Sequence, residues 1–261
     1  MIEEVQRQYL QAMGVEVWQR RDLPAGVPSS LPSVAIVESA VQSGLPPRKE
    51  ALQKLSVSDS AVQLVNDLTT MDWNALRSAV SHCERCSLHT TRTQTVFGVG
   101  DQQARLMIVG EAPGGDEDRQ GEPFVGRAGQ LLNEMLQAIG FKREQVYIAN
   151  ILKCRPPNNR DPQAEEVGCC EPYLQRQIAL VQPAVILAVG RIAAQNLLKT
   201  DQRMGALRGQ EHRYPGSDIP LIVTYHPAYL LRSPLEKRKA WEDLQRTRAL
   251  TKSELKDHAS D

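Results

Sequence analysis

The chain has 261 residues with 31 basic and 31 acidic side chains, so its formal net charge at pH 7 is zero. Hydrophobic residues make up 41% and charged residues 24%, which excludes wholesale disorder and a fibrous composition. No apolar run approaches the roughly 20 residues of a membrane span, and the polar N-terminus does not resemble a secretory signal. We therefore expect a soluble, cytoplasmic and monomeric protein without membrane contact.

The first 68 residues differ in composition from the rest. Residues 1–22 carry apolar side chains at helical spacing and predict a short N-terminal segment. Residues 23–68 are rich in Pro and Ser and contain no aromatic side chain. This composition is typical of a linker, because so little apolar surface cannot offset the entropy lost on ordering. The flexible extension either recruits a replication or repair protein or is dispensable.

Residues 69–250 are expected to form the folded domain, followed by a tail at residues 251–261. Asp72 is a suitable N-cap for a first helix over 73–81. The strands predicted after it are 106–109, 145–151, 185–189 and 221–224, and the helices are 129–139, 165–181, 191–198 and 235–250. This alternation predicts an α/β fold with a largely parallel sheet and helices on both of its faces.

Several polar residues come directly after predicted strands, where ligands bind in parallel sheets. Glu111 follows the first strand within a Gly-Pro turn, Asn150 ends the second, and His226 follows the last. An amide suits the edge of a base but can also cap a turn. A histidine there is either an electrophile or a structural residue. Phe124 either packs under a lid or offers a stacking surface, and the acidic run 116–118 is expected to be solvated.

The five cysteines indicate a metal site more than a disulfide framework, because their number is odd and the expected compartment is reducing. Cys83 and Cys86 form a C-x2-C pair, and Cys154 and either Cys169 or Cys170 could complete a four-thiolate set. Spacing alone does not choose between zinc and an iron–sulfur cluster, since both accept four thiolates. The alternative is a group of unligated core cysteines.

Five motifs occur in one order: the C-x2-C pair, GEAPG at 110–114, GEPFVGRAG at 121–129, NILKCRPPNNRDP at 150–162 and HPAYLLR at 226–232. Together with Cys170, they resemble the iron–sulfur (family 4) uracil-DNA glycosylases over roughly residues 70–250. The resemblance implies a three-layer α/β/α sandwich with a central four-stranded, mainly parallel sheet. It also implies a monofunctional DNA-repair enzyme that releases uracil from DNA and leaves an abasic site.

The resemblance also implies roles for individual residues. Cys83, Cys86, Cys154 and Cys170 would hold a [4Fe–4S] cluster. Gly110, Glu111 and Ala112 would line the uracil pocket, Phe124 would stack on uracil, Asn150 would bind its edge, His226 would face the carbonyl that gains negative charge, and Arg232 would belong to the DNA-entering loop. Glu111 or Glu117 would assist catalysis, because Ala112 stands where better-known relatives carry a water-activating aspartate.

Two other function classes fit the sequence. One is a zinc- or cluster-stabilised DNA-binding module without catalytic turnover, and the other is a nucleotide-binding protein. The second lacks a complete phosphate-loop or dinucleotide fingerprint. If the cysteines bind a cluster, it would tie the Cys83 turn to the 154–170 loop. Lys153, Arg155 and Arg160 would then be exposed and would contact DNA phosphates.

Overall fold

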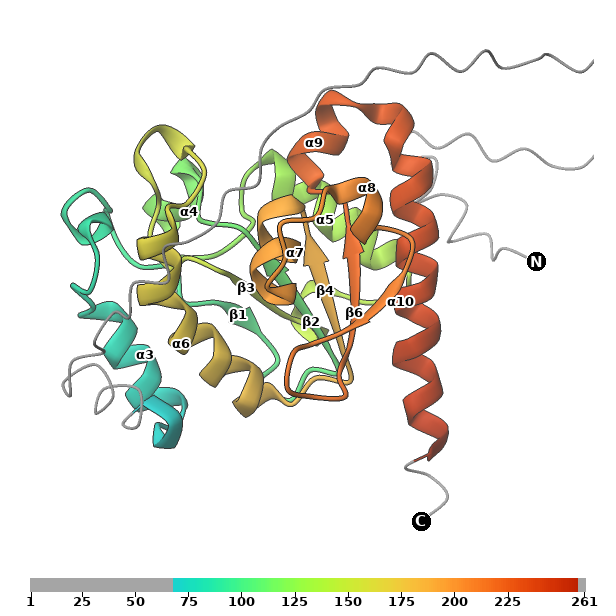
Figure 1. Cartoon of the computed structure of the whole chain (residues 1–261), viewed down its shortest axis with the longest axis horizontal. Helices are drawn as coiled ribbons and strands as arrows, with labels where there is room; N and C mark the ends of the chain where they lie inside the picture. The colour runs from blue at the N-terminus through green and yellow to red at the C-terminus, as the bar shows by residue number, and fades with distance from the viewer. Residues whose placement is uncertain (1–67, 258–261) are drawn as a thin grey trace, which may run out of the picture.

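The computed structural model describes residues 68–257, with side chains up to Lys252. Its centre is a six-stranded sheet in the order β1-β3-β2-β4-β6-β5 (Figure 1). The four inner strands are parallel: β3 (Tyr147–Asn150), β2 (Leu106–Gly110), β4 (Val185–Val189) and β6 (Pro220–Thr224). The edges are antiparallel: β1 (Val99–Gly100) and β5 (Glu211–Arg213). The expected count of four strands is wrong, because edge strands of two and three residues are too short to show a period of two.

Helices cover both faces of the sheet, as the alternation predicts. One hydrophobic core lies between the sheet and α3 (Trp73–Ser81), α6 (Ala164–Val181) and α7 (Arg191–Leu198). The other lies between the sheet and α5 (Arg127–Ala138), α9 (Pro227–Arg232) and α10 (Lys237–Asp257). Figure 1 shows α10 as the long red helix on one side and α3 and α6 on the other. The molecule therefore has three layers.

Short helices complete the chain between these elements. They are η1 (Ser87–Thr90), α4 (Gly115–Gln120), η2 (Arg143–Gln145), η3 (Pro157–Asn159), α8 (Met204–Leu207) and η4 (Pro234–Glu236). The sequence analysis foresaw none of them. Asp118, in α4, is buried and accepts hydrogen bonds from the amide and hydroxyl of Thr93. The expectation of a solvated acidic run is therefore wrong at Asp118, whose carboxylate anchors α4.

The inner strands are completely buried, since each is covered by helices on both faces. Gly110 and Asn150 pair directly across β2 and β3, so both strands end at the same level. Ile151 and Leu152 then donate to the carbonyls of Gly110 and Glu111. The pairing thereby continues past the strands and fixes the two segments from which the candidate site is built.

No helix of the described residues is long and apolar enough to cross a membrane. Residues 1–67 and 258–261 lie outside the described part. The expectations for the N-terminal segment, for nearly all of the linker and for the end of the tail therefore lie outside it as well.

Candidate active site

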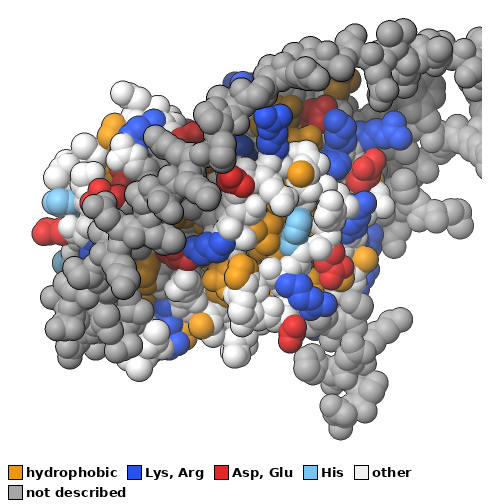
Figure 2. All heavy atoms as spheres, viewed as in Figure 1, with side chains coloured by type: hydrophobic (Ala, Val, Ile, Leu, Met, Phe, Trp, Pro, Cys, Tyr) orange, Lys and Arg blue, Asp and Glu red, His pale blue; other side chains and the backbone are white. Residues whose placement is uncertain are grey.

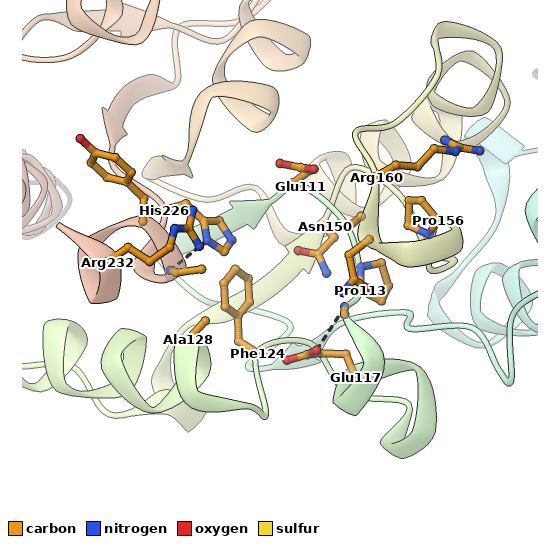
Figure 3. A pocket seen from close by; sticks show the side chains of 15 residues that line it. Glu111, Pro113, Glu117, Phe124, Ala128, Asn150, Pro156, Arg160, His226 and Arg232 are labelled. Atoms are coloured by element: carbon orange, nitrogen blue, oxygen red, sulfur yellow. Dashed lines mark hydrogen bonds between the residues drawn. The ribbon is translucent and has the colours of Figure 1, made fainter.

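One cavity of ≈ 440 Å³ opens at the carboxyl ends of the inner strands. Residues from five separate segments line it, and Figure 3 shows Glu111, Phe124, Asn150 and His226 pointing toward its centre. The predicted site residues Ala112, Glu117 and Arg232 also line it. Gly110 lies beneath it, in contact with Asn150 and Phe124. The structure thus brings together every residue that the sequence analysis assigned to the pocket.

Asn150 contributes a buried amide at the end of β3. The residue is 2% exposed, and its side-chain oxygen has no hydrogen-bond partner among the described residues. A buried amide oxygen without a partner is costly, and native proteins keep few of them. The Asn150 amide therefore retains hydrogen-bonding capacity at the cavity, as a ligand-binding group would.

Phe124 forms one wall of the cavity in a backbone conformation that non-glycine residues rarely adopt, with φ of 54°. Its ring centroid lies 5.6 Å from that of His226, and the ring planes differ by 31°. A Cβ on Gly110 would come within 2.6 Å of the ring, and one on Gly129 within 1.8 Å of the Phe124 carbonyl oxygen. The two glycines thus leave the space in which Phe124 is held.

His226 is the N-cap of α9. Its Nδ1 accepts a hydrogen bond of 3.1 Å from the amide of Ala228, so a neutral ring carries its proton on Nε2. Burial, reinforced by the positive charge of Arg232, lowers the pKa of His226 to about 4. The imidazole is therefore neutral at pH 7, and it can serve as a hydrogen-bond donor through Nε2 without carrying a charge.

The two glutamates of the cavity have different surroundings. Burial raises the pKa of Glu111 to about 7, with a further contribution from Asp161. Glu117 instead accepts three backbone hydrogen bonds, from Gly114, Val125 and Gly126. Its carboxylate joins the turn after β2 to the loop that carries Phe124. The Glu111 carboxyl can therefore change its protonation state near neutral pH, and the Glu117 carboxylate holds the walls of the cavity in place.

Figure 2 shows Lys and Arg side chains beside hydrophobic ones on the face of the molecule that is turned toward the viewer in Figure 1. Arg232 is exposed in the last turn of α9, at the edge of the cavity. Arg160 turns away from the cavity centre in Figure 3 and forms two hydrogen bonds with the buried Glu166. Lys153 is 1% exposed. The expectation of an exposed Lys153 is therefore wrong, and Arg160 is engaged in a structural ion pair.

The five cysteines gather at a second place, between α3, the segment after β3 and α6. All of them line one small cavity there. Cys154 accepts a hydrogen bond of 3.2 Å from Arg92, and Cys170 accepts one of 3.2 Å from the amide of Lys153. Cys169 instead donates to the carbonyl of Arg85. A thiol must carry its proton to donate, so Cys169 differs in this respect from Cys154 and Cys170, whose sulfurs accept hydrogen bonds.

Comparison with known proteins gives this arrangement a context. The family model of the uracil DNA glycosylase superfamily matches residues 97–245. A type-4 uracil-DNA glycosylase of Pyrobaculum aerophilum is 43% identical over 180 residues, which cover 67% of this chain and 92% of the relative. The type-4 enzyme of Archaeoglobus fulgidus is 46% identical over 173 residues, covering 64% and 87%. That of Thermotoga maritima is 42% identical over 178 residues, covering 67% and 92%. The chain belongs to the type-4 uracil-DNA glycosylase family.

In this family member, the structure adds residues that sequence reasoning missed. Asn159 and Tyr229 also line the cavity, and Arg143 donates to the carbonyl of Pro123 and so holds the loop before Phe124. Leu235 is 92% exposed just after α9. Proline beside His226 and Leu235 is a signal for the short helices α9 and η4, because proline is favoured at a helix start.

Proposed function

We propose that this chain hydrolyses the N-glycosidic bond of deoxyuridine in DNA, releasing uracil and leaving an abasic site. Membership of the type-4 uracil-DNA glycosylase family supports this activity. The observation that carries the mechanism is the convergence of the Asn150 amide, the Phe124 ring and the His226 imidazole in one cavity. A base within a duplex cannot reach such a cavity, so the nucleotide must rotate out of the stack.

Asn150 and Phe124 account for selection of the base. The ring of Phe124 stacks on the flat face of uracil, which contributes about 1–3 kcal/mol. The Asn150 carbonyl oxygen accepts from uracil N3–H, and its amide nitrogen donates to uracil O4. Cytosine presents an acceptor and a donor in the opposite arrangement. A bound cytosine would therefore leave buried polar groups unpaired, which costs about 1–3 kcal/mol for each group.

His226 stabilises the departing base. Cleavage of the glycosidic bond leaves negative charge on uracil and positive charge on the sugar. The Nε2–H of a neutral His226 donates to the uracil carbonyl that gains this charge, and the hydrogen bond strengthens as the bond breaks. The amide of Ala228 fixes the ring tautomer, so no proton transfer is needed to prepare the donor.

The carboxylates of the cavity are placed to act on the sugar and on the attacking water. Glu111 lies at the carboxyl end of β2 and has capacity to orient water or to stabilise the sugar cation when it is ionised. Glu117 is a positioning residue, because its oxygens already accept backbone hydrogen bonds. Ala112 offers no such group. Arg232 at the cavity edge is placed to contact a DNA phosphate.

The chemistry of the second cavity fits a [4Fe–4S] cluster. Cys83, Cys86, Cys154 and Cys170 would hold it, and it would supply a structural crosslink between α3 and α6. Burial raises the pKa of the Cys170 thiol to about 12, so its thiolate needs compensating positive charge. No three His, Cys, Asp or Glu side chains in residues 68–252 are placed to hold a single metal ion. Four thiolates are a ligand set that both zinc and an iron–sulfur cluster accept, and membership of the type-4 family favours the cluster.

Base release from an oligonucleotide with a single uracil tests the proposal. We expect the wild-type protein to release uracil and Asn150→Asp to do so about 10- to 100-fold more slowly, since the variant leaves uracil O4 unpaired. Asn159→Asp is the matched control, because Asn159 lines the same cavity but accepts from Arg155. DNA binding without base release by the iron-loaded wild type would favour the binding module instead.

A further inference from the structure

Lys153 is a fully buried cation between the two sites. Its side chain is 1% exposed, and its Nζ donates to the backbone carbonyl of Asn150 at 2.9 Å and to Oε1 of Gln177 at 2.6 Å. Gln177 is 0% exposed and lies on α6, the helix that also carries Cys170. Lysine is among the residues least often buried completely, so this placement calls for a physical reason.

The hydrogen bonds of Lys153 do not balance its charge. Both acceptors are neutral oxygens, and burying an unpaired ammonium group is costly. Lys153 lines the same small cavity as the five cysteines, and its amide donates to the Cys170 sulfur at 3.2 Å. Thiolates at Cys154 and Cys170 would be the missing counter-charge. The Lys153 ammonium therefore donates to the end of β3, which carries Asn150, and Lys153 also lines the cavity of the five cysteines.

The backbone around Lys153 connects the same two places. Asn150, Lys153 and Cys154 fall within five consecutive residues. The amide of Lys153 donates to Cys170, and its carbonyl accepts from Val96. A shift of Cys170 would consequently move the Lys153 main chain, which donates to its sulfur. The Lys153 side chain would move with it, and that side chain holds the Asn150 carbonyl.

We infer that Lys153 is a positioning residue that couples the four-cysteine site to base recognition. Its ammonium compensates the charge of the thiolates at Cys154 and Cys170 and at the same time holds the end of β3 where the Asn150 amide meets the base. This inference rests on the proposed function for the identity of the base and of the cluster. It assigns to the cysteine site an effect on base selection in addition to its effect on stability.

The reduction potential of the proposed cluster tests the effect of the Lys153 charge. Removing a positive charge beside a cluster disfavours its reduced, more negative form, so Lys153→Met should have a lower reduction potential than the wild type. Iron should also pass more quickly to a chelator. Lys142→Met, which removes an exposed lysine, is the control and should leave both values unchanged. If Lys153→Met does not fold, Lys153→Gln provides the same test, because it removes the charge and keeps an N–H donor.

The coupling is tested by a double-mutant cycle with Asn150→Ala, using single-turnover rates of uracil release. If Lys153 acts through the Asn150 amide, Lys153→Met should slow the wild type but have little further effect in Asn150→Ala. A purely structural role predicts that the two losses add. Additive losses, or an unchanged reduction potential, would overturn the inference. Failure of the wild type to release uracil would instead overturn the proposed function, and the potential would still test the charge.

Discussion

Glu111 and Glu117 show how strongly local surroundings decide the chemistry of a residue. They line the same cavity, and burial raises the carboxyl pKa of Glu111 to about 7. Glu117 has its oxygens occupied by backbone amides. The sequence motif places both acids near the uracil pocket but does not distinguish them, because desolvation depends on which strands and loops surround each side chain.

The pKa of Glu111 leads to a testable pH dependence. If the ionised carboxylate is the active form, kcat/KM should rise as the pH increases through about 7 and level off above it. Glu111→Gln should remove this rising limb and lower the plateau by about 100-fold. Initial rates of uracil release between pH 5 and 9 measure this pH dependence, because the range extends roughly two units on each side of the Glu111 pKa. Persistence of the limb in Glu111→Gln would assign it to another group. Glu117→Gln should retain the limb.

At the scale of elements, the long helices and buried strands follow from local physical signals. The Asp72 side chain accepts from the amide of Ala75 and begins α3 where the capping preference predicts. Strand β4 occupies the expected residues 185–189. The short elements escape such reasoning, since α4 and α9 have six residues each, and α4 is held by hydrogen bonds from the distant Thr93 to Asp118. Those short helices supply Glu117 and Arg232, so the details of the site are less predictable than the sheet beneath it.

The close pairing of β2 and β3 makes Gly110 a sensitive position. A Cβ at this residue would lie 2.4 Å from the Asn150 side-chain oxygen and 2.6 Å from the Phe124 ring. Gly110→Ala should therefore displace both groups, lower kcat/KM for uracil by about 100-fold and reduce stability by about 1–3 kcal/mol. Gly168→Ala is the control, because a Cβ there meets nothing within 4 Å. Single-turnover assays and thermal unfolding give the two values, and an active Gly110→Ala would show that the site tolerates the methyl group.

At the scale of the whole molecule, the cysteine site joins segments that are remote in sequence. Cys169 contacts Arg85 across 84 positions, and Arg92 contacts Cys154 across 62. The C-x2-C pair is visible in the sequence, and spacing leaves the fourth ligand open between Cys169 and Cys170. Of these two residues, Cys170 accepts a backbone hydrogen bond at its sulfur, whereas the Cys169 thiol donates one to a backbone carbonyl. Both sulfurs line the cavity, so Cys170 as the fourth ligand stays a prediction.

The iron content of two alanine variants should distinguish the roles of Cys169 and Cys170. Cys170→Ala should lose its iron and visible absorbance, while Cys169→Ala should keep both. Because a bound metal group contributes to folding free energy, a loss of about 4 kcal/mol would lower the Tm of Cys170→Ala by about 8–16 °C. Iron analysis and thermal unfolding of the purified variants measure these effects. Equal iron content in the two variants would contradict the proposed ligand set.

The span of the cysteine site also constrains how the molecule is made. A ribosome releases Cys83 and Cys86 long before Cys154, and Cys170 comes later still along the chain. The nascent chain therefore displays an incomplete set of thiols for much of its synthesis. A cluster held by all four can be installed only after α6 has left the ribosome. If these four cysteines hold the proposed cluster, its delivery is consequently a late event in the biogenesis of the protein, and chains truncated before Cys170 would lack one of its ligands.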